Sequence, residues 1–403
     1  MAVKVKVGLI GALDMLKFKN MAKVREMAIQ AAPANEITAD FVINNNAKAL
    51  HPDFQELVVD KVIDHAGAGA KTYLMRSKDG GPLAYFRAGQ YLSLKLAIDG
   101  SKITRPYSIS SAPKDALKGV VSVTVRSNPG GFAAEHMLKE FKEGDEILSS
   151  GPQGNFYYEP LRDPEHIVAL AGGSGITPFL AMAQAIADGT EDFDLTILVG
   201  SRTREQILFG EELDALAAGC EKIHVVHVLS DEEADGFEHG FITADLIRKY
   251  AKEPYSVFVC GPEAMYRFVK VELDKLGLPR KNIRCEMLGV TKKIAEAEGF
   301  PAEAKGKVFD ITVRQGSEEY KIKASSEEPV LVAVERAGIT APSRCRSGEC
   351  GWCRSKVLEG TYFAPAENEN RRYADIKWNY IHPCATFPTS DMVIEVPAEY
   401  TPK

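Results

Sequence analysis

The sequence predicts a multi-domain protein of the α/β and β class, in which an antiparallel β-barrel precedes a parallel-sheet α/β domain. Its 403 residues exceed the roughly 100–200 residues of a single domain. From about 54 to 157, short alternating segments are separated by Gly and Pro turns, which is typical of a small barrel. From about 165 to 290, apolar strands alternate with helical stretches, which indicates βαβ units around a parallel sheet.

Composition excludes several classes of protein. Hydrophobic residues make up 45% of the chain and charged residues 26%, so a disordered or fibrous protein is excluded. The net charge of −7 offers no basic surface to nucleic acid, and we expect no partner of that kind. No apolar run approaches the roughly 18 residues of a membrane-spanning helix, and the N-terminus lacks a secretory signal. We therefore expect a cytoplasmic protein without a membrane span.

Residues 1–53 form a predicted N-terminal helical extension. Apolar residues recur at roughly helical spacing among basic ones, which predicts one or two amphipathic helices. We expect this segment to pack on its own domain or on a second subunit. The alternatives are docking on a membrane surface or on a partner protein.

Residues 54–157 form the predicted barrel, with strands at 57–63, 71–76, 90–96, 120–126 and 146–148. Residues 158–294 form the predicted α/β domain, with strands at 166–171, 194–200, 222–229, 255–260 and 283–288. Residues 295–307 lack periodicity and predict a linker. Residues 308–403 form a third unit, with a hairpin of 308–314 and 320–323, a helix at 330–337, a cysteine-rich loop and a last strand at 392–396.

The strongest motif lies in this third unit. Four, two and thirty residues separate its cysteines, which are Cys345, Cys350, Cys353 and Cys384. That spacing is typical of plant-type [2Fe-2S] ligation. Small residues in the loop allow it to curl around a cluster and leave backbone N–H groups facing the sulfurs. A tetrahedral zinc site is the competing interpretation, but zinc sites pair two short cysteine knuckles and only one half of this motif has that form.

Residues 308–403 resemble a plant-type ferredoxin domain, and the preceding domains resemble the ferredoxin-NADP reductase superfamily. The domain order resembles the phthalate dioxygenase reductase type and the reductases of hybrid-cluster proteins. The resemblance implies a flavin-binding β-barrel, an NAD(P)-binding α/β domain and a β-grasp ferredoxin domain. It leaves residues 1–53 unexplained.

In the barrel, residues 105–111 match the family's R-x-Y-S flavin motif. The resemblance implies that Tyr107 stacks on the isoalloxazine, that Ser108 hydrogen-bonds near flavin N5 and that Arg105 binds a flavin phosphate. The expected flavin-binding residues of this motif are Arg105, Pro106, Tyr107, Ser108, Ile109 and Ser110.

A second flavin motif resembles the family's loop at the cofactor pyrophosphate, where a helix N-terminus accepts an anion. It comprises Gly130, Gly131, Phe132 and Ala133. Ala133 stands where FAD enzymes often carry Ser or Thr, which removes one phosphate hydrogen bond and leaves FMN possible. We expect FAD, because the loop has no obvious purpose beside a mononucleotide.

Two turns of the α/β domain predict the coenzyme site. The first is a Gly-rich turn between a strand and a helix, where backbone N–H groups can approach a diphosphate. The second follows the strand at 255–260 and in relatives lies under the nicotinamide, with the cysteine as a contact residue and not a nucleophile. The residues concerned are Gly172, Gly173, Ser174, Gly175, Thr177, Cys260, Gly261 and Pro262.

Ser201 and Arg202 fall where relatives recognise the adenosine 2′ position, and Arg202 or Arg204 could bind a 2′-phosphate. NADH-dependent relatives also carry Arg here, so NADH and NADPH both remain open. Glu286 falls near the place of an acidic residue beside the flavin in relatives, although a Glu at a strand end is usually only solvated. The expected catalytic residues are Ser108, Cys260 and Glu286.

Together these motifs predict an electron-transfer reductase. NAD(P)H donates two electrons as hydride, whereas a [2Fe-2S] cluster accepts one at a time, and a flavin connects the two. We expect electrons to pass from NAD(P)H through flavin and cluster to an acceptor protein of unknown identity. The alternatives are a reductase component of a larger oxygenase or anaerobic reductase system, and a redox-sensing module without turnover. Partner docking or homo-oligomerisation through the N-terminal extension is a further expectation.

Overall fold

The computed structural model describes residues 9–32, 41–128, 130–286, 289–290 and 293–398. It divides into two units, Met1–Asn46 and Ala47–Lys403.

The N-terminal segment contains helices α1 (Leu9–Ala31) and α2 (Val42–Leu50). Because Lys17 and Lys19 are two positions apart, they lie on opposite sides of α1, and apolar side chains are exposed all around it. The amphipathic pattern predicted for this helix is therefore wrong, while its expected packing stays a prediction.

The first sheet of the second unit is the antiparallel barrel. Its strands are β1 (Gln55–His65), β2 (Ala70–Ser77), β3 (Tyr91–Ile98), β4 (Ser101–Ser108), β5 (Val120–Arg126) and β6 (Glu146–Ser149), in the order β4-β3-β6-β1-β2-β5. A β-bridge between Ile109 and Val123 joins the two edges. Helices α3 (Pro113–Ala116) and α4 (Phe132–Glu140) flank β5 along the chain. β4 is not among the strands predicted for the barrel, and it contains Pro106. An edge strand tolerates proline, and β4 pairs only with β3 in this sheet.

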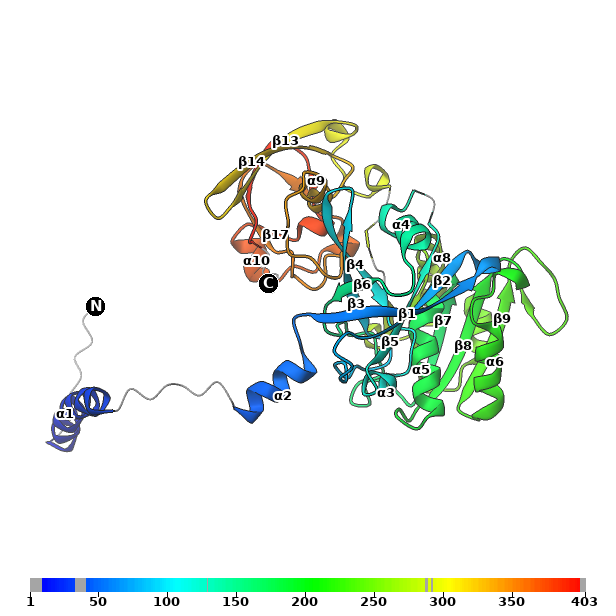
Figure 1. Ribbon diagram of the computed structural model, residues 1–403, viewed down its shortest axis with the longest axis horizontal. Coiled ribbons are helices and arrows are strands. Elements are labelled where there is room, and N and C mark those ends of the chain that lie inside the picture. Colours follow the sequence, from blue (N-terminus) through cyan, green and yellow to red (C-terminus); the bar gives the residue numbers. More distant parts are fainter. Residues whose placement is uncertain (1–8, 33–40, 129, 287–288, 291–292, 399–403) are drawn as a thin grey trace. The chain divides into compact units, whose positions relative to one another are not determined.

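The second sheet is parallel throughout. Its strands are β7 (His166–Gly172), β8 (Asp194–Ser201), β9 (Ile223–Leu229), β10 (Glu238–His239), β11 (Tyr255–Cys260) and β12 (Ile283–Glu286), in the order β10-β9-β8-β7-β11-β12. Helices α5 (Thr177–Ala187) and α6 (Gly210–Gly219) pack on one face (Figure 1). Helices α7 (Ala244–Tyr250) and α8 (Glu263–Asp274) pack on the other. Since β7 and β11 are neighbours, the turns that follow them meet at one edge of the sheet.

The third sheet is mixed and has the order β14-β13-β19-β15-β17. It is built from β13 (Val308–Gln315), β14 (Glu318–Ser325), β15 (Ser355–Glu359), β17 (Tyr380–Ile381) and β19 (Met392–Glu395), with helix α9 (Val330–Arg336) packed in its core. Strands β16 (Tyr362–Phe363) and β18 (Phe387–Pro388) form a small second sheet, and α10 (Tyr373–Lys377) precedes β17. The three sheets confirm the predicted fold class.

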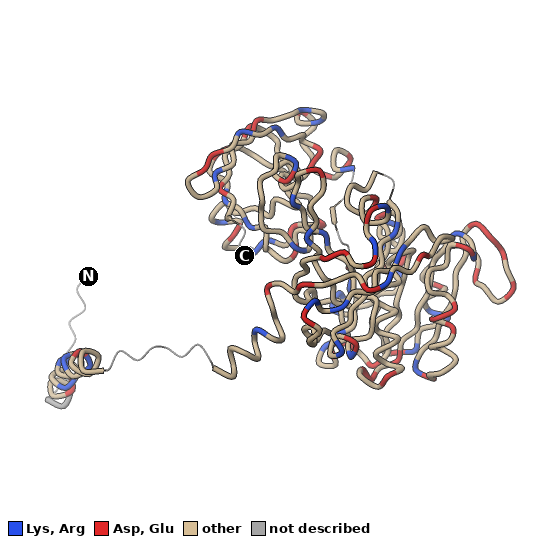
Figure 2. The backbone as a smooth tube through the Cα atoms, viewed as in Figure 1, with Lys and Arg blue, Asp and Glu red and all other residues tan. Residues whose placement is uncertain are grey.

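The segment predicted as a linker packs against the third domain. It contains 3₁₀ turns at Ile294–Glu296 and Ala302–Ala304, and Ala304 is buried. The Phe300 ring meets the Phe363 ring edge-on, with centroids 5.4 Å apart. Acidic and basic residues are interspersed along the chain (Figure 2). None of the described helices combines the length and the apolar character needed to cross a membrane.

Candidate active site and cluster loop

The three residues expected to be catalytic lie together where the barrel meets the parallel sheet. Ser108 ends β4, and its hydroxyl donates a hydrogen bond of 3.1 Å to Glu286 Oε2. Glu286 ends β12 and stands beside Cys260 in the register of the two parallel strands. All three side chains are buried. Their roles stay predictions, but the fold gives them one common location.

Burial governs the ionisation of this group. It raises the pKa of Glu286 to about 8; the hydrogen bond from Ser108 lowers that pKa, and the negative charge of Glu349 raises it further. Burial raises the pKa of the Cys260 thiol well above its ordinary value, and the charge of Glu286 raises it further. At neutral pH Glu286 is therefore mostly a neutral acid and Cys260 a neutral thiol, which suits a contact residue better than a nucleophile.

The flavin motif on β4 divides into two parts. Tyr107 is half-buried and Arg105 is partly exposed, so both present side-chain atoms outside the barrel core. Ile109 lies entirely in the core, and Ser110 bonds the Ser122 hydroxyl at 2.8 Å. The amides of Ile109 and Ser110 also bond within the barrel, at 2.9 Å each. The backbone N–H groups of these two predicted cofactor residues and the Ser110 hydroxyl are therefore engaged within the barrel.

The second flavin motif lies at the start of α4. Gly130 N–H donates a hydrogen bond of 2.7 Å to Glu135, and Ala133 is buried while Phe132 is half exposed. The first turn of α4 therefore already holds one carboxylate near its N-terminus.

The two coenzyme turns fit against each other without space for side chains. A Cβ on Gly175 would lie 2.1 Å from the Cys260 carbonyl oxygen and 2.7 Å from Gly261 N. Glycine at this position lets the Gly-rich turn after β7 contact the turn after β11. Thr177 fixes the start of α5 by donating a hydrogen bond of 2.9 Å to the Ser174 carbonyl. The backbone N–H groups of the Gly-rich turn could therefore approach the diphosphate of a dinucleotide closely.

The structure adds Arg126 to this region, a residue that the motif comparison missed. It ends β5, and its Nη1 would lie 2.3 Å from a Cβ on Gly173. Burial lowers the pKa of Arg126, and the nearby charge of Arg202 lowers it further. Arg126 therefore places a guanidinium group directly beside the Gly-rich turn. A basic residue shortly before the Gly130–Gly131 loop was the available sequence signal.

The four cysteines of the third domain form a continuous series of contacts. Cys345 contacts both Cys350 and Cys384, and Cys384 Sγ lies 3.4 Å from Cys353 Sγ. Cys345 Sγ accepts N–H bonds from Ser347 (3.5 Å) and Cys350 (3.3 Å). Within the described residues, no group of three or more His, Cys, Asp or Glu side chains is arranged to hold a metal ion. The four thiols at plant-type spacing, with backbone N–H donors to Cys345, are the groups that would hold a two-iron cluster.

The loop around these thiols is shaped by Gly348, which adopts φ +80°. A Cβ there would lie 2.5 Å from the Asn368 carbonyl oxygen and 2.9 Å from the Ala385 methyl. Only glycine fits this close, left-handed position. The Arg344 guanidinium stacks on the Trp352 ring at 3.5 Å, which orders the outer side of the loop.

Comparison with known proteins agrees with this architecture. Family models match residues 74–158 as an oxidoreductase FAD-binding domain, 169–271 as an oxidoreductase NAD-binding domain and 313–389 as a 2Fe-2S iron-sulfur cluster binding domain. The chain is 27% identical over 328 residues to the glycine betaine monooxygenase reductase subunit from Chromohalobacter salexigens, covering 78% of this chain and 88% of the relative. It is 32% identical over 232 residues to NADH-cytochrome b5 reductase 1 of Candida glabrata, covering 56% and 79%.

The chain belongs to the ferredoxin-NADP reductase superfamily. Its fold is that of the solved phthalate dioxygenase reductase, with a TM-score of 0.61 at 23% identity over 85% of this chain and 98% of that one. It is an NAD(P)H-dependent oxidoreductase with an FAD-binding domain and a [2Fe-2S] ferredoxin domain.

In this reductase the cluster loop lies close to the buried Ser108–Glu286 pair. Burial raises the pKa of Tyr91 on β3, and the nearby Cys345 and Cys350 raise it further. Tyr91 is also the partner of Ser108 in the β3–β4 register. One buried side chain thus lies within electrostatic range of both the flavin motif and the cluster thiols.

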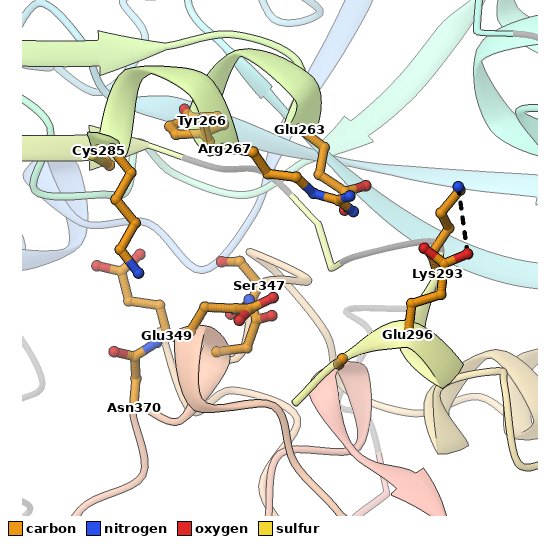
Figure 3. Close-up of a pocket in the computed structure, with 13 residues that line it drawn as sticks. Glu263, Tyr266, Arg267, Cys285, Lys293, Glu296, Ser347, Glu349 and Asn370 are labelled. Carbon is orange, nitrogen blue, oxygen red and sulfur yellow. Dashed lines mark hydrogen bonds and ion pairs between the residues drawn. The ribbon is translucent and has the colours of Figure 1, made fainter. Parts of the chain in front are cut away.

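A cavity of about 540 Å³ separates the nucleotide-binding domain of the reductase from its ferredoxin domain (Figure 3). Arg267 on α8 lines one side, and Ser347 and Glu349 of the cluster loop line the other. Lys293 and Glu296 close a third side and form an ion pair of 3.5 Å. Charged side chains from both domains therefore line this cavity.

Proposed function

We propose that this chain is the reductase component of an oxygenase system. In this proposal it oxidises NADH, passes electrons singly to its ferredoxin domain and delivers them to the metal centre of a separate oxygenase protein. Relatives of the chain include reductase components of monooxygenases, which supports this choice of acceptor. A cytoplasmic location is part of the proposal, supported by a cysteine set in which four of the seven residues would bind a cluster rather than form disulfides.

The observation that carries the electron route is the packing of the cluster loop beside the flavin motif. Arg346, which follows Cys345, donates a hydrogen bond of 2.5 Å to Glu335, and the other carboxylate oxygen of Glu335 lies 3.8 Å from Arg105 Nη1. A flavin held by the motif and a cluster held by the loop would therefore lie on either side of one domain boundary.

The residues have separate tasks in this proposal. Bound flavin would accept a hydride and release electrons one at a time. Tyr107 would stack on the ring, Arg105 would bind phosphate, and Ser108 with Glu286 would hold a proton at the reacting edge. Cys260 and the Gly-rich turn would support the nicotinamide and the diphosphate, and Arg126 would bind the diphosphate. The four cysteines would hold the cluster.

We further propose NADH as the preferred coenzyme. Arg204 is engaged by Glu232, through its Nε at 2.7 Å and its backbone N–H at 2.9 Å. Arg202 lies 4.0 Å from Asp231. These carboxylates already engage the two guanidinium groups and would repel a 2′-phosphate, so we expect roughly a tenfold preference for NADH.

Anaerobic titration with NADH, and separately with NADPH, tests both proposals. We expect NADH to bleach the visible flavin absorbance, after which electron paramagnetic resonance shows a reduced cluster. NADPH should require about ten times the concentration for the same rate. A flavin that is reduced while the cluster stays oxidised would disprove the electron route, and equal efficiency of the two coenzymes would disprove the NADH preference alone.

The N-terminal extension completes the proposal as a docking segment for a partner or a second copy of the chain. Its support is the set of exposed apolar side chains that surround α1, including Leu13, Leu16, Phe18 and Met21. We expect the full chain to elute as a larger assembly than a chain beginning at residue 54. Equal monomeric elution, with equal activity toward the oxygenase, would remove this part of the proposal.

A further inference from the structure

We propose that Glu335 is a positioning residue that docks the ferredoxin domain on the flavin domain. It does so by joining two arginines, Arg346 of the cluster loop and Arg105 of the flavin motif. This inference rests on the electron route proposed above and assigns one side chain to the flavin-to-cluster step.

Glu335 lies on α9, which contacts β4 of the barrel. Arg346 Nη1 donates a hydrogen bond of 2.5 Å to Glu335 Oε1. Arg105 Nη1 lies 3.8 Å from the other oxygen, Glu335 Oε2. Each carboxylate oxygen therefore faces one arginine, and the two arginines come from different domains.

This ion triad is shielded from water. Side-chain exposure is 4% for Glu335, 9% for Arg346 and 24% for Arg105. Burial lowers the pKa of Arg105 to about 10, and the charge of Arg346 lowers it further, while Glu335 opposes both effects. Without Glu335, two guanidinium groups would face each other across the domain boundary. A buried carboxylate between them is what makes their close approach favourable.

The position of Arg346 links this contact to the cluster. Arg346 directly follows Cys345, and its backbone takes the left-handed conformation at φ +58°. A non-glycine residue keeps such a conformation only where surrounding contacts hold it. The bond to Glu335 is one such contact, so the carboxylate fixes the loop that carries the first cysteine.

The other boundary of the ferredoxin domain is of a different kind. Toward the nucleotide-binding domain the cluster loop faces the polar cavity described above (Figure 3). Two ion pairs that line this cavity, Lys293–Glu296 and Arg267–Glu263, join neighbours along the chain. The triad instead joins residues of two domains in a buried setting, and it is therefore suited to set the distance between flavin and cluster.

Rapid mixing of the holoprotein with excess NADH tests this inference. We expect Glu335→Gln to leave the rate of flavin reduction unchanged and to slow the following cluster reduction at least about tenfold, because a small misplacement of reacting groups has a large effect on rate. Glu335→Asp keeps the charge and should recover part of the rate. Glu328→Gln is the matched control, because Glu328 pairs with Arg336 of α9, and it should behave as wild type.

Hydrogen exchange of the same full-length proteins supplies a readout that does not depend on turnover. Glu335→Gln should exchange faster in β4 and α9, with an unchanged resonance spectrum of the cluster. If Glu335→Gln loses its cluster, the Glu335→Asp protein is used for the test, and its cluster should be reduced more slowly than that of wild type. Wild-type cluster reduction together with wild-type exchange in β4 would overturn the inference. A wild-type protein whose cluster NADH never reduces would instead disprove the electron route, while the exchange data would still decide whether Glu335 docks the domain.

Discussion

A Cys384→Ala chain should lose its [2Fe-2S] cluster and reduce cytochrome c with NADH about 100-fold more slowly, while NADH still reduces its flavin at the wild-type rate. Cys384 is buried and contacts Cys345 and Cys353, so it lies at the centre of the row of thiols. Removing it leaves three ligands where two irons require four. Iron content, the resonance spectrum and stopped-flow absorbance measure the three effects.

The matched control is Cys220→Ala, because Cys220 is a half-buried thiol of the nucleotide-binding domain that packs against the apolar core. We expect that variant to keep two irons per chain and full activity. Wild-type iron content in the Cys384→Ala chain would show that the cluster has another fourth ligand. Slow flavin reduction in the same chain would show that the change had disturbed the flavin domain as well.

Replacing Glu286 by Ala should slow hydride transfer from NADH to flavin about 100-fold, the usual effect of removing a positioned acid or base. The carboxyl is buried and accepts a hydrogen bond from Ser108 at 3.1 Å. Ala would leave the Ser108 hydroxyl without its partner. Glu286→Gln should stay within about tenfold of wild type at pH 7, because the neutral amide resembles the protonated carboxyl. Single-turnover flavin reduction measures both.

The pH dependence of this step follows from the pKa of Glu286, which burial raises to about 8. Wild-type hydride transfer should fall as pH rises through that value, and Glu286→Gln should show no such fall. Ser108→Ala should move the fall to higher pH, because the hydrogen bond from Ser108 lowers the pKa of Glu286. Glu272→Gln, a buried carboxyl of α8 that accepts the Ala244 N–H at 2.9 Å, should keep the wild-type profile.

The same pKa has a consequence for stability. A folded-state value of about 8 against an ordinary 4.5 means that the folded chain keeps a proton that the unfolded chain releases. The contribution of Glu286 to stability is therefore lost as pH rises from about 4.5 to about 8, and it is constant outside that window. The melting temperature of Glu286→Gln should rise relative to wild type across this window. A constant difference between the two proteins would show that Glu286 titrates normally.

The sequence by itself determined the order of the three sheets, the Gly-rich turn after β7 and the four cysteines. Each of these depends on residues that are neighbours along the chain or recur at a fixed spacing. Hydrophobic periodicity and turn chemistry therefore report them directly. The alternation did not report β4, a strand that contains Pro106 and accommodates it at the edge of the sheet.

Only the tertiary structure decided how these parts meet. Ser108 and Glu286 are 178 residues apart, and Arg105 and Glu335 belong to different domains. No spacing rule relates such residues, because their contact depends on how separate folded domains pack. In the structure, Ile109 and Ser110 also face into the barrel, and Arg126 lies beside the Gly-rich coenzyme turn. Local chemistry thus specifies which groups the protein carries, and long-range packing specifies which of them lie close enough to act together.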